Sequence, residues 1–258
     1  MQDLTLVKIG GNLIDDESKL AACLEAFSKI KGAKLLVHGG GKLASELAKQ
    51  LGIESPMIEG RRITNAETLK VVSMVYAGLI NKKIVAGLQA LNQEAIGLCG
   101  ADDNLILSEK RQHPSIDYGY VGDVSKVNSE ALSNYIEQGK VLVLSAITHD
   151  GNGQLLNTNA DTVATELAIA LCENYNVKLI YSFEKPGVLI NPEDDMSFLK
   201  SLDMNVYQEM KENGSINNGM LPKTENAFRA FNKGVKVIIG DLLRISKDEY
   251  CGTQLIES

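Results

Sequence analysis

The chain has 258 residues, of which 44% are hydrophobic and 23% are charged, so it can bury a stable core without disulfides. Its 26 lysines and arginines stand against 33 aspartates and glutamates, and the formal charge of -7 argues against a broad nucleic-acid surface. The four cysteines are widely spaced, and the sequence shows neither an export signal nor a run of about eighteen apolar residues. We therefore expect a reduced, cytoplasmic protein that binds neither nucleic acid nor a membrane.

The first part of the chain alternates between strands and helices. Residues 4–9 are predicted to form a buried strand that ends at a pair of glycines, and residues 34–38 a second strand that ends at three glycines. Apolar residues at helical spacing predict a helix over residues 20–30, between the two strands. A strand-helix-strand order indicates a parallel sheet and hence an α/β fold.

The same alternation continues to the end of the chain. Further helices are predicted at residues 43–51, 65–88, 130–137, 159–171 and 221–232. Further strands are predicted at residues 95–98, 104–107, 120–127, 141–145, 177–181 and 235–239. The pattern renews itself after a polar stretch at residues 173–176, so we expect an N-terminal lobe of residues 1–173 and a C-terminal lobe of residues 174–258.

Two glycine-rich loops each lie between a predicted strand and a predicted helix. Their sequences are Lys8-Ile9-Gly10-Gly11 and His38-Gly39-Gly40-Gly41. Free backbone amides and a helix N-terminus favour an anion such as phosphate at such a place. For either loop alone a tight turn is the better explanation, but on adjacent parallel strands both loops would open into one crevice, and together they favour function. Neither loop is a Walker A motif.

Polar residues at two predicted helix starts are further candidates. The segment from Asn157 through Asn159 to Asp161 places two amides and a carboxylate at a helix start, where capping explains them about as well as catalysis does. Lys223 follows Pro222 in the first turn of a later helix, where a lone lysine is usually just solvated.

The pair Arg61 and Arg62 is open to two interpretations. A guanidinium can bind a carboxylate through two parallel hydrogen bonds, whereas two neighbouring arginines are also common on a protein surface. The three histidines show no metal-ligand spacing, and no arrangement typical of a nucleophilic hydrolase is found in the sequence.

Five motifs carry a resemblance when they are taken in order. They are K-x-G-G at 8–11, V-H-G-G-G at 37–41, G-x-R at 60–62, N-x-N-x-D at 157–161 and G-M-x-x-K at 219–223. Together they resemble the amino-acid kinase family, and within it the N-acetylglutamate kinases, over nearly the whole chain. The resemblance implies a three-layer αβα sandwich with a central mainly parallel sheet. It also implies an acylglutamate-binding N-terminal lobe, a nucleotide-binding C-terminal lobe, and a homodimer formed partly by the helix at residues 65–88.

The resemblance also implies residue roles. Lys8 and Lys223 would be catalytic by neutralising the moving phosphoryl group, and Asp161 would hold both ammonium groups in place. The implied phosphate-binding residues are Gly10, Gly11 and Gly41, and the implied substrate-binding residues are Gly40, Gly41, Arg62, Asn157 and Asn159.

The implied reaction is ATP-dependent phosphorylation of the γ-carboxylate of an N-acyl-L-glutamate, with N-acetyl-L-glutamate as the expected substrate, early in arginine and ornithine biosynthesis. A carboxylate is already ionised at neutral pH, so it needs charge neutralisation rather than a general base. The implied cofactors are ATP and Mg2+, and Mg2+ is expected on ATP oxygens rather than on dedicated protein ligands.

One segment departs from the family pattern. Phe183 stands where the family usually has an acid, and Glu184 is a candidate to compensate. This departure leaves a non-catalytic ligand sensor of the same fold open as an alternative. An N-succinylglutamate substrate stays open because the sequence does not identify the acyl pocket, and so does the substrate of another amino-acid kinase.

Overall fold

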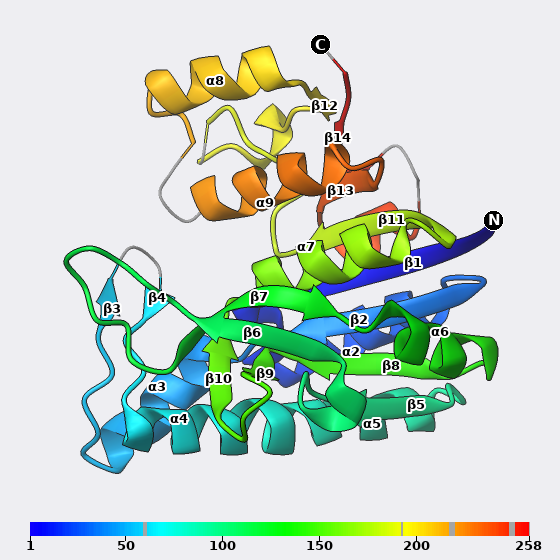
Figure 1. Ribbon diagram of the computed structural model, residues 1–258. Helices are drawn as coiled ribbons and strands as arrows, with labels where there is room; N and C mark the ends of the chain where they lie inside the picture. The colour runs from blue at the N-terminus through cyan, green and yellow to red at the C-terminus, as the bar shows by residue number, and fades with distance from the viewer. Residues whose placement is uncertain (59–60, 192, 217–219, 248–250, 258) are drawn as a thin grey trace.

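A single eight-stranded sheet runs through the molecule (Figure 1). The computed structural model describes residues 1–58, 61–191, 193–216, 220–247 and 251–257. The strands of this sheet are β1 (Gln2–Ile9), β2 (Ala33–His38), β5 (Ala95–Leu98), β8 (Val141–Ser145), β11 (Tyr175–Ser182), β12 (Ser201–Leu202), β13 (Lys236–Gly240) and β14 (Thr253–Leu255). Their spatial order is β12-β14-β13-β11-β1-β2-β8-β5, and all neighbours are parallel except β13 and β14.

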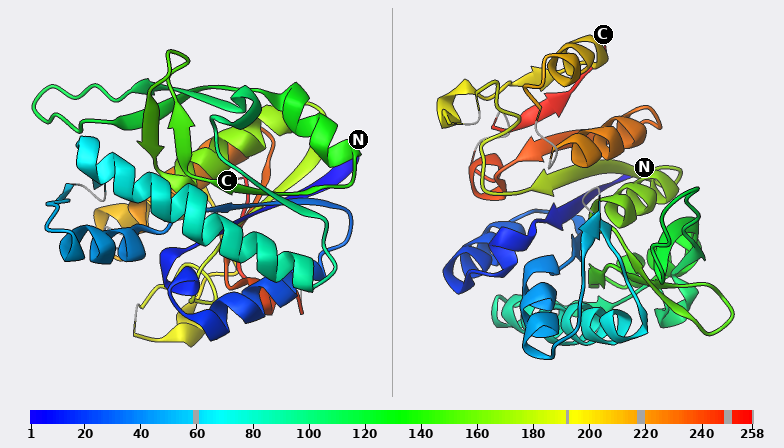
Figure 2. Two further views of the ribbon diagram at one scale, coloured as in Figure 1. Left: turned by 90° about the horizontal axis from the view of Figure 1, so that it is seen from below. Right: turned by 90° about the vertical axis from the view of Figure 1, so that its left-hand side faces the viewer.

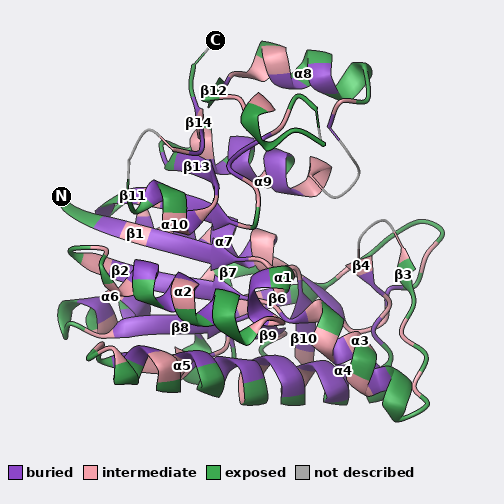
Figure 3. Ribbon diagram, turned by 180° about the vertical axis from the view of Figure 1, so that it is seen from behind, coloured by how far each residue is buried: buried purple, intermediate pink, exposed green. Residues whose placement is uncertain are grey.

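Helices cover both faces of this sheet and give the molecule three layers (Figures 2 and 3). One face carries α2 (Glu17–Ser28), α5 (Asn81–Ala90) and α10 (Leu242–Ile245). The other face carries α6 (Ser129–Glu137), α7 (Ala160–Leu171) and α9 (Leu221–Phe231). Because both faces are covered, the central strands are continuous apolar runs rather than alternating ones. The predicted αβα sandwich with a mainly parallel sheet is confirmed.

One long helix follows the edge of the N-terminal part. It consists of α4 (Ala66–Ser73), a π-helical stretch η1 (Met74–Ile80) and α5, and the Asn65 side chain caps its start by accepting a hydrogen bond from the amide of Thr68 at 2.8 Å. This helix is long and apolar enough to span a membrane, and no other helix among the described residues is. Its inward side chains, among them Val72 and Ile84, belong to the hydrophobic core.

Smaller elements complete the fold. They are the strands β3 (Met57–Ile58), β4 (Arg61–Arg62), β6 (Ile106–Lys110), β7 (Val121–Val127), β9 (Ile147–His149) and β10 (Leu155–Thr158), the helices α1 (Gly11–Ile14), α3 (Gly41–Gln50) and α8 (Met204–Glu212), and the 3-10 turns η2 (Asp102–Asn104) and η3 (Asp195–Ser197). Strands β10, β7, β6 and β9 form a small closed sheet, and β3 pairs with β4 as a hairpin.

One predicted strand begins later than expected. The strand predicted at residues 104–107 starts at Ile106, because Asp103 and Asn104 adopt left-handed conformations with φ of 49° and 54°. A strand does not accommodate such backbone angles, and aspartate and asparagine adopt them more readily than most residues.

The central strands bring the candidate loops together. β1 lies between β2 and β11, and the register places Lys8 beside Val37 on one side and Tyr181 on the other. The carboxyl ends of these three strands therefore meet at one edge of the sheet, where ligands usually bind in such folds. β11 begins next to the predicted lobe boundary, and it pairs with β1 in the same sheet, so the division into two lobes stays a prediction.

Candidate active site

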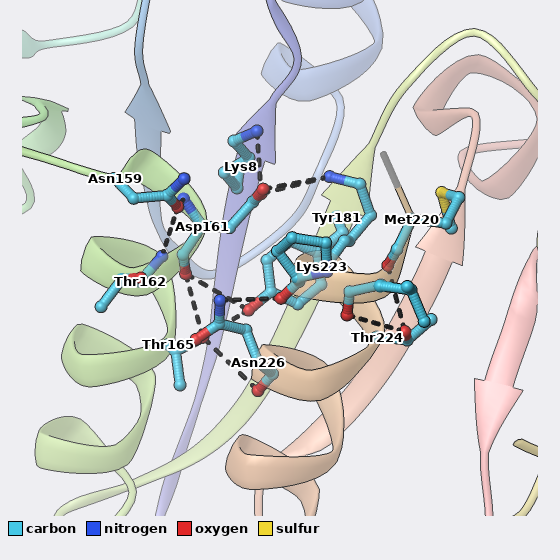
Figure 4. Close-up of polar contacts among 12 residues, drawn as sticks. Lys8, Asn159, Asp161, Thr162, Thr165, Tyr181, Met220, Lys223, Thr224 and Asn226 are labelled. Atoms are coloured by element: carbon cyan, nitrogen blue, oxygen red, sulfur yellow. Dashed lines mark hydrogen bonds and ion pairs between the residues drawn. The ribbon is translucent and has the colours of Figure 1, made fainter. Parts of the chain in front are cut away.

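Lys8, Asp161 and Lys223 lie together at the carboxyl end of β1 (Figure 4). Lys8 comes from β1, Asp161 from the first turn of α7 and Lys223 from the first turn of α9. The Lys8 Nζ lies 2.8 Å from Oδ1 of Asp161, and the Lys223 Nζ lies 3.2 Å from Oδ1 and 3.4 Å from Oδ2 of the same carboxylate. Both lysines are 8% exposed. The sequence thus identified three distant residues that the fold brings into direct contact.

The cluster is held in a charged state by its own members. Burial by itself would raise the pKa of Asp161, but the ammonium groups of Lys8 and Lys223 outweigh burial and hold this pKa well below its usual range. Burial, together with repulsion from Lys8, lowers the pKa of Lys223 to about 8, although the carboxylate of Asp161 opposes both effects. At neutral pH two ammonium groups therefore share one carboxylate, which leaves a net positive charge.

The start of α7 aims Asp161 at the lysines. The side-chain oxygen of Asn159 accepts hydrogen bonds from the amides of Asp161 at 2.8 Å and Thr162 at 3.1 Å, so Asn159 is the N-cap of this helix. Capping and site formation are therefore compatible at this segment. Because the oxygen of Asn159 is engaged, only its NH2 group is left to meet a ligand.

A cavity of about 200 Å³ opens beside Lys8 and Asp161. Most of the predicted site residues line it: Lys8, Gly11, Gly40, Gly41, Arg62, Asn157, Asn159 and Asp161. Lys223 is not a lining residue of this cavity, and it reaches Asp161 from α9. Gly10 does not line the cavity either, and its amide donates to the carbonyl of Ser182 at 3.0 Å. The amide of Gly10 is thus engaged, which corrects the expectation that it is free for a phosphate.

The glycine loop after β2 needs glycine at position 40. Gly40 has φ of 152°, and a Cβ atom there would lie 2.1 Å from Cδ1 of Ile80. This close approach sets the start of α3 against the long helix, and the amide of Gly41 opens α3 beside the cavity. The first amides of a helix have no acceptor within the helix, so they are suited to an anion.

The buried side chain of His38 also holds the glycine loop after β2 in place. Burial lowers the pKa of His38 to about 4, so the ring is neutral at physiological pH. Its Nδ1 donates to the carbonyl of Gly39 at 2.9 Å, and its Nε2 accepts a hydrogen bond from Nδ2 of Asn81 at 3.1 Å. His38 is fully buried and holds the loop, without lining the cavity.

Arg62 is a cavity residue and not a surface residue. It is 6% exposed, and its guanidinium donates to the carbonyl of Gly41 at 2.7 Å, to Oγ of Ser45 at 2.8 Å and to Oγ of Ser55. Nδ2 of Asn157 donates to Oγ1 of Thr64 at 3.0 Å. The first residue of the G-x-R motif and the first residue of the G-M-x-x-K motif lie outside the described residues.

Several residues that line the cavity were given no role from the sequence, although Ile9, Gly39, Arg61, Thr158 and Ala160 lie inside the motifs that it singled out. The residues without an assigned role are Ile9, Gly39, Met57, Arg61, Tyr76, Val121, Ala146, Thr158 and Ala160. Tyr76 is typical of the group, since it lies on the long helix at a position that reads as an ordinary core residue. Only the three-dimensional packing turns its ring toward the cavity, so no local signal could have found it.

The segment that departs from the family pattern contacts the cluster through aromatic rings. The Lys223 Nζ lies 5.4 Å from the ring centroid of Tyr181 and 5.9 Å from that of Phe183. Glu184 binds elsewhere, with Oε1 2.6 Å from Nζ of Lys19 and Oε2 3.0 Å from Nδ2 of Asn12. Glu184 therefore does not supply the cluster with a second carboxylate.

Comparison with known proteins assigns the chain to one family. The amino acid kinase family profile matches residues 3–241. The acetylglutamate kinase of Cytophaga hutchinsonii is 53% identical over 93% of this chain and 91% of its own, and that of Parabacteroides distasonis is 53% identical over 93% and 94%. A solved Streptococcus mutans UA159 structure matches with a TM-score of 0.77 at 28% identity, over 93% of this chain and 95% of that one. The chain belongs to the amino acid kinase family.

Proposed function

We propose that this protein is an acetylglutamate kinase, which transfers the γ-phosphoryl group of ATP to the γ-carboxylate of N-acetyl-L-glutamate. The observation that carries this proposal is the contact of Lys8 and Lys223 with the single carboxylate of Asp161, beside a cavity lined by glycine loops. The reaction is an early step of arginine biosynthesis and takes place in the cytoplasm. Relatives that are named acetylglutamate kinase and match over nine-tenths of the chain support it.

The arrangement suits a phosphoryl transfer between two anions. A γ-carboxylate oxygen of the acylglutamate forms a bond to the γ-phosphorus, and the bond from that phosphorus to the β,γ-bridging oxygen breaks, so that ADP leaves. No proton has to be removed from the carboxylate at neutral pH. Lys8 and Lys223 neutralise the charge that spreads over the transferring group, and Asp161 keeps the two ammonium groups at a fixed separation.

Mg2+ enters the reaction as part of the MgATP substrate. Asp161 is the acidic residue of the cluster, and both of its carboxylate oxygens are occupied by ion pairs and hydrogen bonds with Lys8 and Lys223. Within the described ranges no group of three or more histidine, cysteine, aspartate or glutamate side chains is arranged to hold a metal. Mg2+ commonly keeps several waters and binds substrate phosphates, so the site fits a metal that is carried mainly by ATP.

The remaining residues divide between phosphate and substrate. The amides of Gly11 and Gly41 open helices at the cavity and contact the γ-phosphate. Arg62 turns its guanidinium from the carbonyl of Gly41 to a carboxylate of the acylglutamate, and the side-chain amides of Asn157 and Asn159 contact the rest of that molecule.

The larger organisation follows the same reasoning. Residues 1–173 bind the acylglutamate and residues 174–258 bind the nucleotide. The protein forms a homodimer through the long helix of residues 66–90, on which the apolar side chains of Met74 and Leu79 are 55% and 59% exposed. Light scattering of the purified protein tests the dimer, and a Leu79→Arg variant should shift it toward the monomer.

A turnover assay tests the proposed function. Purified protein with MgATP should release ADP when N-acetyl-L-glutamate is added, and hydroxylamine should trap the acyl phosphate product. N-succinyl-L-glutamate, L-glutamate, L-aspartate and carbamate are assayed in parallel at equal concentration. If the protein prefers N-succinyl-L-glutamate, the acyl group assigned to the substrate is wrong but the assigned phosphoryl transfer stands. If the protein binds an acylglutamate without releasing any ADP, it is a ligand sensor.

A further inference from the structure

The ammonium group of Lys223 lies among aromatic rings as well as next to Asp161. Its Nζ is over the ring of Tyr181 at 5.4 Å from the centroid and over the ring of Phe183 at 5.9 Å. A cation within about 6 Å of an aromatic centroid is attracted by the negative face of the ring. Tyr181 is fully buried and Phe183 is half-buried, so water competes little with this attraction.

Tyr181 is itself held in place by α7. Its hydroxyl lies 2.5 Å from Oγ1 of Thr165 and 3.4 Å from the carbonyl of Asp161. The hydroxyl of Thr165 in turn donates to that carbonyl at 2.9 Å. Tyr181 therefore contacts both the helix that carries Asp161 and the side chain of Lys223.

A buried ammonium at this position needs stabilisation that does not cancel its charge. The titratable groups that face Lys223 are Asp161 on α7, Lys8 on β1 and Tyr181 on β11. Asp161 is shared with Lys8, and burial raises the pKa of Tyr181, so Tyr181 stays neutral. Aromatic rings stabilise a cation without adding a negative charge, and the positive charge stays available to a phosphoryl group.

We propose that Tyr181 and Phe183 form an aromatic cage that positions the Lys223 ammonium and keeps it protonated for phosphoryl transfer. This inference rests on the proposed kinase function and adds two positioning residues to it. Neither ring exchanges a proton or forms a bond in the reaction. The rings act through Lys223, and their effect should therefore appear in the pH dependence of turnover more than in substrate affinity.

The test compares Phe183→Leu with Phe231→Leu, a matched control at the other end of α9 that loses a half-buried ring beside a separate surface cavity. Phe183→Leu should lower kcat about threefold to tenfold and keep the KM values for ATP and for the acylglutamate within about twofold of the wild type. In the pH profile of kcat/KM for ATP, it should move the basic limb about half a pH unit lower. Phe183→Asp should move that limb to higher pH, because a carboxylate favours the charged lysine. The control should do neither.

Tyr181→Phe separates the ring from the hydroxyl. It keeps the ring over Lys223, so the basic limb should stay within about a fifth of a pH unit of the wild type. A shift as large as that of Phe183→Leu would assign the effect of Tyr181 to its hydroxyl and overturn the cage. Unchanged kcat and an unchanged basic limb in Phe183→Leu would overturn it as well.

A measurement independent of turnover separates this inference from the proposed function. In protein labelled with isotope-enriched lysine, the Lys223 ammonium is titrated by NMR and assigned by its loss in Lys223→Ala. The pKa of Lys223 should fall in Phe183→Leu and stay unchanged in Phe231→Leu. If the wild type releases no ADP but this shift is seen, the kinase function fails while the cage stands. If ADP is released and the shift is missing, only the cage fails.

Discussion

Lys34 and Lys223 are both buried lysines, yet they lie at opposite ends of helices and are satisfied in opposite ways. Lys34 lies beyond the C-terminal end of α2, where its Nζ donates to the carbonyls of Ser28 at 2.7 Å, Ile30 at 2.8 Å and Phe27 at 3.2 Å. Lys223 lies in the first turn of α9, where the helix dipole opposes a positive charge. Both are less than a tenth exposed, and burial lowers the pKa of both.

The comparison teaches that burial of a lysine does not by itself indicate catalysis. The three protons of the Lys34 ammonium have three carbonyl acceptors, so this lysine has the features of a structural cap. Among the described residues, the Lys223 ammonium forms an ion pair with one carboxylate, that of Asp161, and it shares this carboxylate with Lys8. A cation that is placed against a helix dipole, and only partly neutralised, is suited to binding an incoming anion.

Removal of either cluster lysine should have the largest effect. Lys8→Ala and Lys223→Ala should each lower kcat by about a hundredfold to a thousandfold, because each removes a positive charge from the transferring phosphoryl group. Thermal unfolding should change little, since Asp161 keeps the other lysine as partner. Lys29→Ala is the control, because it removes the same charge from an exposed pair with Glu25. Near-normal kcat in both cluster variants would refute the assigned roles.

Asp161→Asn should disturb both stability and activity. It leaves two buried ammonium groups facing each other without a carboxylate, and the loss of one partner from a buried ion pair costs about 3–5 kcal/mol of unfolding free energy. Urea denaturation of the wild type and the variant at neutral pH measures this difference.

The effect of Asp161→Asn should depend on pH with a defined sign. The pKa of Asp161 is lower in the folded protein than in the unfolded chain, so its stabilisation is complete above about pH 4 and is lost as the pH falls through the folded value. The difference in unfolding free energy between the variant and the wild type should therefore be constant from about pH 5 to about pH 7 and should shrink in stronger acid. A difference that grew toward acid would contradict the ion-pair assignment.

Activity of the wild type should fall in mild base. The pKa of Lys223 is about 8, so this lysine is protonated at neutral pH and loses its charge as the pH rises. We expect kcat/KM for ATP, which reports on the free enzyme, to drop about tenfold per pH unit above that value. Lys223→Ala should lack this limb at its lower level of activity. A flat profile in the wild type up to about pH 9.5 would show that the charge of Lys223 is not required.

The sequence predicted the site better than its surroundings. Lys8 lies near the end of β1 and Asp161 in the first turn of α7, two regular elements of eight and twelve residues with a clear apolar pattern, so their places at the edge of the sheet were foreseeable. Strands such as β12 and β14, with two and three residues, carry no period that a sequence pattern can reveal. The amide of Gly10 donates to the carbonyl of Ser182, which is far away in the chain. The sequence around Gly10 therefore gives no sign of this hydrogen bond.

The two buried lysines differ in the same way. Lys223 stood in a recognisable motif, whereas Lys34 looked like one polar position in an apolar strand. Its three carbonyl partners become visible only once the strand β2 is folded back beside the end of α2. Sequence motifs therefore identified the lysine of the site, and three-dimensional packing identified the lysine of the scaffold.

Lys34→Met should have the smallest effect on activity and a clear effect on stability. Methionine keeps the apolar stem but removes three charged donors, so the unfolding free energy should fall by about 2 kcal/mol while kcat stays within about twofold of the wild type. Lys31→Met is the matched control, because Lys31 is an exposed lysine in the same connection, and its change should stay within about 0.5 kcal/mol. Urea denaturation and turnover are measured on the same preparations. A large loss of kcat in folded Lys34→Met protein would place this lysine in the function after all, and the distinction between a donor-saturated lysine and a shared one would then have no predictive value.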